Sequence, residues 1–238
     1  MSEQPVVKKI SKKEVKIDKE VNSILLYNDD WKRKYIHPDL LSKEYDLFID
    51  EIDTHGIGRD IYCFPGLTPR FCDELVQIAN LKNDWGRVGH EEYRTFDTWL
   101  ETLGMNKVYN SFIKDYITPL GEHVFGEVGN DFNDLSKVEN FIAKYPSNHK
   151  HSALPVHVDD SDYSIQVSLN NLEDYIGGGT WYPKQKALIK VPKGYVVMHP
   201  GSIGFSHGAR RVLSGTRYQL VSFIKGHKSG TDTLRPAF

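Results

Sequence analysis

The stretch Pro155-Val156-His157-Val158-Asp159 begins the part of the sequence that decides its fold. Residues two apart in a β-strand point to the same face, so His157 and Asp159 can reach one metal ion together. His207 comes much later in the chain, and Arg217 follows it after ten residues. A histidine from a distant strand would complete a triangle of ligands on one side of the ion. We therefore predict a metal site formed by His157, Asp159 and His207.

Two histidines and one carboxylate leave the opposite metal positions open, which is the ligand set of non-haem Fe(II) oxygenases. A lone His-x-Asp also occurs in solvated loops, so the residues that follow it carry the argument. Residues 163–169 alternate as a strand does, with Ile165 and Val167 on one face. Gly177-Gly178-Gly179 indicates a tight passage of the backbone. Arg217 could bind a carboxylate through two parallel hydrogen bonds, and its alternative role is a structural salt bridge.

The composition is that of one globular domain without a disulfide framework. Of the 238 residues, 39% are hydrophobic and 12% aromatic, which is enough for a real core. The formal net charge of −2 argues against a general nucleic-acid binder, and Cys63 and Cys72 are too few for a disulfide scaffold. No apolar run reaches the ~18 residues that suggest a membrane span. The N-terminal part lacks the apolar region of a secretory signal, so we expect a cytoplasmic location if the chain begins at Met1.

Short strands broken by Gly and Pro dominate the second half of the chain and predict a sandwich or jelly roll. Thr68 caps a helix that begins with Pro69, and a second helix places apolar residues at three- and four-residue steps from Val108 to Ile117. We expect strands at residues 60–64, 95–99, 138–145, 179–182, 187–191, 195–199, 204–207 and 217–224. The predicted fold is mainly β with flanking helices (α+β), a double-stranded β-helix (jelly roll) with an N-terminal helical layer.

The ends of the chain differ from its centre. Residues 1–28 form a Lys-rich segment that we expect to be a flexible tail, with an amphipathic docking helix as the alternative. Residues 29–226 are the expected domain, and residues 227–238 are a C-terminal tail. His149 and His151 lie in a polar loop, where we expect surface residues rather than metal ligands.

Many of these elements together resemble the catalytic domain of the procollagen lysyl hydroxylases, which are Fe(II)- and 2-oxoglutarate-dependent dioxygenases. The resemblance covers roughly residues 30–224, and the glycine triplet and the His-Pro-Gly element are its most specific parts. The matching elements are Asp30-Trp31-Lys32-x-Lys34-Tyr35-Ile36-His37, His157-x-Asp159, Tyr175-x-Gly177-Gly178-Gly179, His199-Pro200-Gly201, His207, Gly215-Thr216-Arg217-Tyr218 and Val221-Ser222-Phe223.

The resemblance implies roles for the residues around the metal. The triad would bind Fe(II), and Arg217 would bind the far carboxylate of the co-substrate 2-oxoglutarate. Tyr145 would add a hydroxyl hydrogen bond to that carboxylate. Gln166, which stands where the lysyl hydroxylases usually have Asn, would reach the co-substrate with its amide. The resemblance also implies succinate and CO2 as co-products and ascorbate as the reductant that keeps the iron active.

The resemblance further implies a possible homodimer, for which Leu213, Leu220 and the tail ending at Phe238 are candidate contacts. His199 also matches a family position, and we expect it to be a structural histidine that faces away from the metal ligands. Several positions depart from the family and leave the substrate open. Trp99 replaces a histidine, Thr180 replaces a cysteine, Phe205-Ser206 replaces His-Tyr, and Gly208 replaces a glutamate.

The favoured function is hydroxylation of lysyl residues in collagen-like polypeptides, with a collagen-like polypeptide as the substrate partner. The nearest alternative is the same chemistry on prolyl residues, another protein or a small amino acid. A non-catalytic jelly-roll binding module is a third reading, against which the intact triad and Arg217 argue. A lysine ammonium needs a balancing charge. We expect Asp162 and Asp174 to provide it, with Asp160 on the rim, while the alternative for all three is a solvated acidic loop.

Overall fold

The protein is described by a computed structural model that covers residues 23–51, 60–86, 95–125 and 138–225. The described helices are α2 (Asp29–Tyr35), α3 (Pro38–Ser42), α4 (Pro69–Lys82), α5 (Asn106–Phe112) and α6 (Thr118–Phe125), with a π-helical turn at Ile113–Ile117 and 3₁₀ turns at Tyr45–Leu47, Leu172–Asp174 and Ile203–Phe205. The described strands are β1 (Asp50–Glu51), β2 (Tyr62–Pro65), β3 (Phe96–Trp99), β4 (Glu139–Pro146), β5 (Leu154–His157), β6 (Tyr163–Ser168), β7 (Tyr175–Gly177), β8 (Thr180–Tyr182), β9 (Ala187–Ile189), β10 (Tyr195–Pro200), β11 (His207–Ala209) and β12 (Val212–Ile224).

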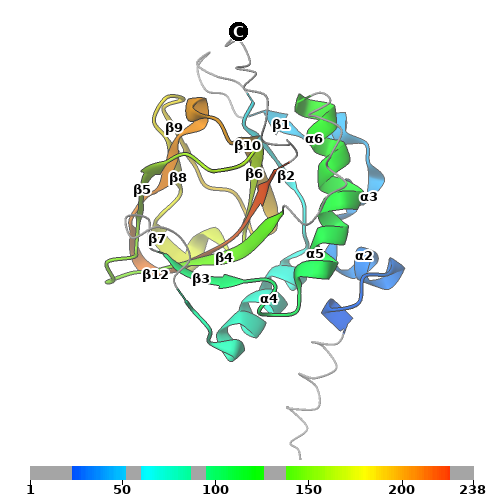
Figure 1. The fold of residues 1–238 in the computed structure, drawn as a ribbon, viewed down its shortest axis with the longest axis horizontal. Helices are drawn as coiled ribbons and strands as arrows, with labels where there is room; N and C mark the ends of the chain where they lie inside the picture. The colour runs from blue at the N-terminus through cyan, green and yellow to red at the C-terminus, as the bar shows by residue number, and fades with distance from the viewer. Residues whose placement is uncertain (1–22, 52–59, 87–94, 126–137, 226–238) are drawn as a thin grey trace, which may run out of the picture.

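The strands form two antiparallel sheets that lie opposite each other (Figure 1). The larger sheet has the order β1-β2-β10-β6-β12-β4-β3, and β7 pairs with the first part of β12. The smaller sheet has the order β5-β11-β8-β9. Neighbouring strands are mostly far apart in sequence, so the fold depends on long-range pairing and not on local hairpins.

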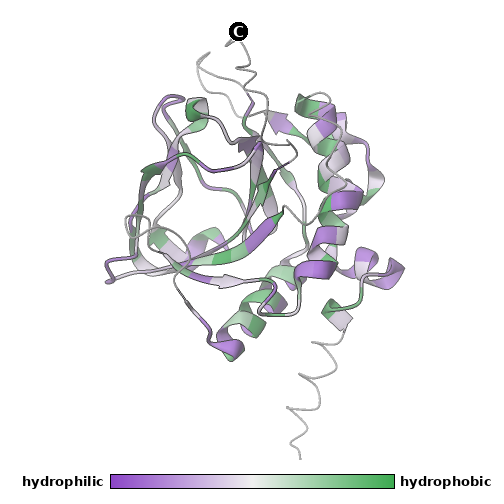
Figure 2. Ribbon diagram, in the orientation of Figure 1, coloured by the Kyte–Doolittle hydropathy of each residue, from purple (hydrophilic) through white to green (hydrophobic). Residues whose placement is uncertain are grey.

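Helices cover the outer face of the larger sheet, on the side away from the smaller one (Figure 1). Helix α4 begins as its sequence predicts, because the Thr68 side chain accepts a hydrogen bond from the backbone N–H of Phe71 and Pro69 needs no such partner. Hydrophobic and hydrophilic residues alternate along α4 and α6, as expected for helices with one buried side (Figure 2). Phe71 and Leu75 of α4 are completely buried in the same cluster as Leu220 of β12. Each such side chain contributes about 1.5–3 kcal/mol by leaving water.

Alternation along the central strands divides the larger sheet into an apolar face and a polar face. Ile165 and Val167 of β6 belong to the core under the helices, whereas Gln166 between them faces the smaller sheet. Every residue of β6 is buried, so its inward polar side chains are enclosed by protein as well. One inward row crosses four strands in register: Trp99, Phe141, Val221 and Gln166. This inward face forms the floor of the functional site.

Most of the strand predictions are confirmed, with two corrections near the C-terminal end. Residues 204–207 were expected to form a strand, but Ile203–Phe205 is a 3₁₀ turn and β11 begins only at His207. The last strand begins at Val212, earlier than predicted, because the exposed segment before Arg217 pairs with β7. Within the described residues, no helix is both long enough and apolar enough to cross a lipid bilayer.

The expected ends of the domain need one revision. Ile24 is buried, and its carbonyl accepts a hydrogen bond from the indole N–H of Trp31, so the folded part begins before residue 29. Residues 1–22 and the C-terminal tail 227–238 lie outside the described residues. Leu220 is fully buried in the core, so the prediction that it forms a dimer contact is wrong. Leu213 is 62% exposed. A homodimer stays a prediction.

Candidate metal centre and substrate cavity

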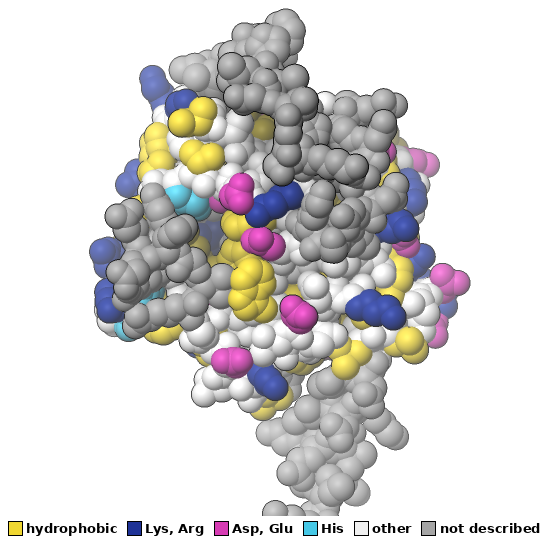
Figure 3. All heavy atoms as spheres, in the orientation of Figure 1, with side chains coloured by type: hydrophobic (Ala, Val, Ile, Leu, Met, Phe, Trp, Pro, Cys, Tyr) yellow, Lys and Arg dark blue, Asp and Glu magenta, His cyan; other side chains and the backbone are white. Residues whose placement is uncertain are grey.

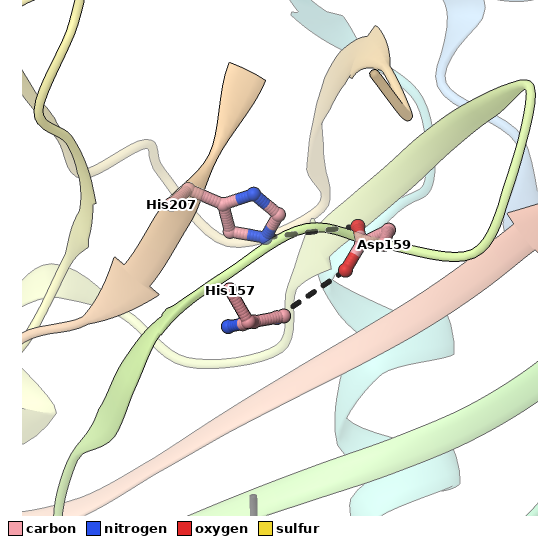
Figure 4. Close-up of side chains that lie close together, drawn as sticks. All are labelled: His157, Asp159 and His207. Atoms are coloured by element: carbon pink, nitrogen blue, oxygen red, sulfur yellow. Dashed lines mark ion pairs between the residues drawn. The ribbon is translucent and has the colours of Figure 1, made fainter. Parts of the chain in front are cut away.

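The three predicted metal ligands come together between the two sheets. His157 ends β5 and His207 begins β11, and these two residues lie opposite each other in register. Asp159 follows β5 in the loop that leads to β6. Their side chains point toward one another from three different backbone positions (Figure 4). Sequence spacing alone indicated that His157 and Asp159 were close, and strand pairing now brings His207 to them.

The geometry of the triad suits a single metal ion. His157 Nε2 lies 3.3 Å from Asp159 Oδ1, and His207 Nε2 lies 3.6 Å from Asp159 Oδ2. Each of the three residues offers a ligand atom within 4.8 Å of the others. Adjacent ligands of an octahedral ion with bonds of about 2.1 Å are roughly 3 Å apart, so small movements would close the site around an ion.

Backbone carbonyls set the orientation of both imidazoles. His157 Nδ1 lies 2.9 Å from the carbonyl oxygen of Pro155, and His207 Nδ1 lies 3.0 Å from that of Phe205. Because a carbonyl only accepts, each Nδ1 carries a proton, and this hydrogen bond turns each Nε2 toward the site. Such hydrogen bonds to the outer nitrogen are usual for metal-binding histidines.

The electrostatics of the site hold Asp159 and His207 in the forms that a metal needs. For His157, burial is outweighed by the raising effect of Asp159 and the Pro155 carbonyl, and the pKa is raised. Burial alone would raise the pKa of Asp159, but His157, His207, His199 and the Ser164 hydroxyl outweigh it and hold that pKa well below its usual range. Ser164 donates a hydrogen bond to Asp159 Oδ2 over 2.6 Å. Burial and the neighbouring His199 lower the pKa of His207 to about 3. At neutral pH the site therefore offers an ionised carboxylate and a neutral imidazole.

A cavity of about 330 Å³ opens beside the triad. Its size lies within the usual range for small-molecule sites. Figure 3 looks onto this face, where a hollow lies next to a histidine and is bordered by acidic, basic and hydrophobic side chains. Apolar walls come from residues of both sheets, including Phe141, Leu154, Val221 and Phe223. Such walls lower the local dielectric and so strengthen the interactions of the few charged groups inside.

Arg217 is the cation of this cavity, and it is 5% exposed. It donates a hydrogen bond to the Thr180 hydroxyl over 3.1 Å, and its guanidinium lies 5.6 Å from the centre of the Tyr145 ring. Within the described residues it forms no salt bridge, so the alternative structural role has no partner there. A buried guanidinium without a carboxylate is costly unless an anionic ligand binds it.

The glycine triplet explains how the backbone passes so close to Arg217. Gly177, Gly178 and Gly179 all have positive φ, at 81°, 65° and 96°. A Cβ at Gly178 would lie 2.8 Å from the Tyr175 ring and 3.4 Å from Arg217 Cδ. Glycine therefore supplies both the left-handed backbone and the free space that this position requires.

Gln166 lies beside the triad, as its alternation in the sequence predicted. Its Nε2 donates to His207 Nε2 over 3.3 Å, and its Oε1 accepts from Thr180 over 3.0 Å. Thr180 in turn accepts from Arg217, so one hydrogen-bonded chain joins the cation to the triad. A metal at His207 Nε2 would replace the bond from Gln166 and release its amide. This fits the expectation that Gln166 reaches a ligand of the metal.

His199 corrects an expectation from the sequence. Rather than facing away from the ligands, it is fully buried beside them, with its ring centre 4.7 Å from that of His207 and Nε2 4.0 Å from Asp159 Oδ2. In the sheet it lies opposite Ser164, which itself faces inward to bind Asp159. Alternation along β10 shows which of its residues share a face with His199, but not which face points inward. The pairing of β10 with β6 decides that.

His151 is also more buried than expected. It is 6% exposed and packs edge-on against Phe96 with a ring separation of 5.2 Å. His149 lies next to the same ring at 4.8 Å. Neither histidine is among the residues that line the cavity. The expectation that they are not metal ligands therefore agrees with their positions, but His151 is not a surface residue.

The acidic residues expected to bind the substrate lie elsewhere. Asp174 is exposed, and its side chain accepts a hydrogen bond from the backbone N–H of Asn171 in a local cap. Neither Asp174 nor Asp162 is among the residues that line the cavity, whereas Asp160 is. Asp160 forms a 2.9 Å salt bridge with Lys225. The geometry thus places Asp160 at the cavity and does not place Asp162 or Asp174 there.

Asp97 on β3 is a cavity residue that sequence reasoning missed as a functional candidate. It is 2% exposed, and burial raises its pKa to about 7. The Thr95 hydroxyl donates to its Oδ2, but within the described residues its buried Oδ1 has no hydrogen-bond partner. The available signal in the sequence was a carboxylate inside a short strand of otherwise uncharged residues.

Asp97 is expected to make stability fall as the pH rises. The ordinary pKa of an aspartate is 3.8 and that of Asp97 in the folded protein is about 7. The contribution of Asp97 to the free energy of unfolding is therefore fully present below pH ~4. It is lost as the pH rises through ~7, and the loss is a few kcal/mol at most. Urea unfolding of metal-free protein at pH 5 and pH 8 should show a smaller loss for Asp97→Asn than for the wild type. An Asp73→Asn control, at an exposed site, should keep the wild-type loss; equal losses in all three proteins would contradict the assignment.

Comparisons with known proteins agree with this geometry. No protein-family model matches the chain. The procollagen-lysine,2-oxoglutarate 5-dioxygenase 2 of Mus musculus is 34% identical over 207 residues, which cover 82% of this chain and 27% of that protein. The corresponding enzyme of Drosophila melanogaster is 32% identical over 209 residues, covering 82% and 28%. This chain is homologous to one region of the procollagen-lysine dioxygenases. It spans about a quarter of the length of these relatives.

Solved structures show the same fold. A 2OG-Fe(II) oxygenase family protein from Burkholderia pseudomallei matches with a TM-score of 0.53 at 15% identity, covering 73% of this chain and 88% of that one. A prolyl-4-hydroxylase from Pseudomonas putida matches with a TM-score of 0.50 at 11% identity, covering 79% and 100%. The predicted jelly roll, mainly β with flanking helices, is confirmed.

Proposed function

We propose that this chain catalyses Fe(II)- and 2-oxoglutarate-dependent hydroxylation of lysyl residues in collagen-like polypeptides. One observation carries the proposal: an open triad of two histidines and a carboxylate shares a cavity with a buried arginine that has no carboxylate partner among the described residues. A binding module has no need of both. The relatives named as procollagen-lysine dioxygenases support lysine as the target.

The residues divide the work of the reaction between them. His157, Asp159 and His207 would hold the iron on one side, because both Nε2 atoms and the carboxylate face the same point. Bound there, iron supplies the chemistry by which O2 and 2-oxoglutarate are converted to succinate and CO2 while one oxygen atom enters a C–H bond of the substrate. Ascorbate is the expected reductant.

Arg217 and its neighbours would orient the co-substrate. The guanidinium binds the far carboxylate of 2-oxoglutarate in a planar, two-bond arrangement, and Thr180 holds the guanidinium in place. Tyr145 is buried on the same wall and keeps its phenol protonated, since burial raises its pKa, so its hydroxyl can donate to the same carboxylate. Gln166 remains the candidate for a contact nearer the metal. Apolar cavity walls exclude bulk water from the reacting atoms.

Mass spectrometry of collagen-like Gly-x-Lys peptides tests the proposal. Incubation with the protein, Fe(II), 2-oxoglutarate and ascorbate should add one oxygen atom to lysine and release one succinate for each hydroxylation. Oxygen on proline or on a free amino acid would favour the alternative substrates. Absence of 2-oxoglutarate turnover with every peptide, together with no retained iron, would favour the non-catalytic binding module.

A further inference from the structure

The cavity contains two buried ionisable groups, one basic and one acidic, that form no salt bridge with each other among the described residues. Arg217 lies on β12 and Asp97 lies on β3, with β4 between their strands. Register places Asp97 opposite Ala143 and Arg217 opposite Tyr145, two residues further along β4. Strand spacing and residue rise put their Cα atoms roughly 10–12 Å apart. Among the described residues no salt bridge joins them, and their side chains instead hydrogen-bond to Thr180 and Thr95.

The other carboxylates on the cavity wall already have counter-charges. Asp160 and Glu139 both bind Lys225, at 2.9 and 3.2 Å. Asp159 faces the two histidines and belongs to the metal. Asp97 is the lining carboxylate without a cation among the described residues, because its hydrogen-bond partner Thr95 is neutral.

The position of Asp97 directs it toward a ligand in the cavity. Ala143 and Gln219, its in-register neighbours on β4 and β12, both line the same cavity, so Asp97 shares their inward face. The Thr95 hydroxyl fixes Oδ2 and leaves Oδ1 without a partner. Burial is the main cause of the raised pKa of Tyr145, and the nearby carboxylates of Asp97 and Asp159 raise it further. Asp97 therefore lies in the same electrostatic environment as the triad.

We propose that Asp97 is a specificity-determining residue that binds the positively charged end of the substrate side chain through its free carboxylate oxygen. The inference rests on the proposed function and assigns its selectivity for a cationic side chain to one residue. With Arg217 paired to the co-substrate and Asp159 to the metal, Asp97 is the charge left for the substrate. A substrate ammonium ion then restores neutrality in a cavity where an isolated carboxylate is costly.

A comparison of lysine and norleucine peptides tests this assignment, since norleucine has the same chain without the ammonium group. Asp97→Asn should lower kcat/KM for the lysine peptide about 10- to 150-fold, the cost of losing a charge-assisted hydrogen bond, and leave the norleucine peptide almost unchanged. The KM for 2-oxoglutarate should change far less than kcat/KM for the lysine peptide, and circular dichroism of the variant shows that it folds. Calorimetry with Zn(II) in place of iron should show the same loss as weaker binding of the lysine peptide.

Two further variants separate this role from a structural one. Asp97→Glu keeps the charge and should retain most of the preference for lysine. Asp174→Asn removes a carboxylate outside the cavity and should keep the wild-type ratio of lysine to norleucine. If the wild type hydroxylates lysine and Asp97→Asn keeps its ratio, the inference is overturned and the proposed function stands. If the wild type turns over 2-oxoglutarate but neither modifies nor prefers lysine, both fall.

Discussion

Replacing His157, Asp159 or His207 with alanine is expected to abolish iron binding and hydroxylation while leaving the fold intact. The three side chains meet at an open cavity between the sheets and not in the apolar core under the helices. Removing groups that merely support a metal ligand already costs about 10- to 100-fold in affinity or activity. Loss of a ligand itself should therefore lower turnover by at least about 100-fold.

Metal analysis of the purified variants, combined with thermal unfolding, checks this expectation. An ion that binds only the folded state raises the melting temperature, so added Fe(II) should stabilise the wild type and not the triad variants. His149→Ala provides a matched control, because this histidine lies near the site in sequence but does not line the cavity. Wild-type turnover in any triad variant would remove that residue from the ligand set.

Local sequence patterns could predict much of this fold because the strands have consistent alternation. Ile165 and Val167 indicated the core face of β6, and Thr68-Pro69 indicated the start of α4. The triad could be predicted because His157 and Asp159 are neighbours in sequence and His207 matched a family position. These are features whose physical cause lies within a few residues or within one recognisable motif.

The remaining parts of the site depend on pairing between distant strands. His199 and Asp97 each need a specific register, with Ser164 and with Ala143, to face inward. A shift of one residue would turn either side chain to the other face, and nothing in the local sequence excludes it. The acidic residues Asp162 and Asp174 attracted attention through their nearness to Asp159 in sequence, which is a poor guide to nearness in space. Only the assembled sheet shows which carboxylate lines the cavity.

The second large effect is expected from Arg217→Lys, which should raise the KM for 2-oxoglutarate at least about tenfold. A lysine ammonium is a point charge that cannot form the two parallel bonds of a guanidinium to a carboxylate. It would also lose the geometry in which Arg217 donates to Thr180 over 3.1 Å. In addition, a lysine buried here without a carboxylate partner would tend to give up its proton, whereas arginine stays charged.

Saturation curves for 2-oxoglutarate with a fixed peptide concentration measure this effect, and calorimetry separates binding from turnover. Arg33→Lys, at an exposed position of α2 paired with Asp30, should keep the wild-type KM. A second probe is 2-oxobutyrate, which lacks the far carboxylate. The wild type should discriminate strongly against it, and Arg217→Lys should discriminate less, because the lost interaction involves the same two groups.

The combination of variant and probe makes the assignment specific. If Arg217 acted only in folding, its replacement would change stability but leave the ratio between 2-oxoglutarate and 2-oxobutyrate unchanged. If the guanidinium binds the far carboxylate, Arg217→Lys and the use of 2-oxobutyrate remove the same interaction. Combining the variant with 2-oxobutyrate should then weaken binding little more than either change alone. Of the described residues that line the cavity, Arg217 is the only lysine or arginine. An unchanged KM for 2-oxoglutarate would therefore require that the co-substrate binds without a cation from this wall.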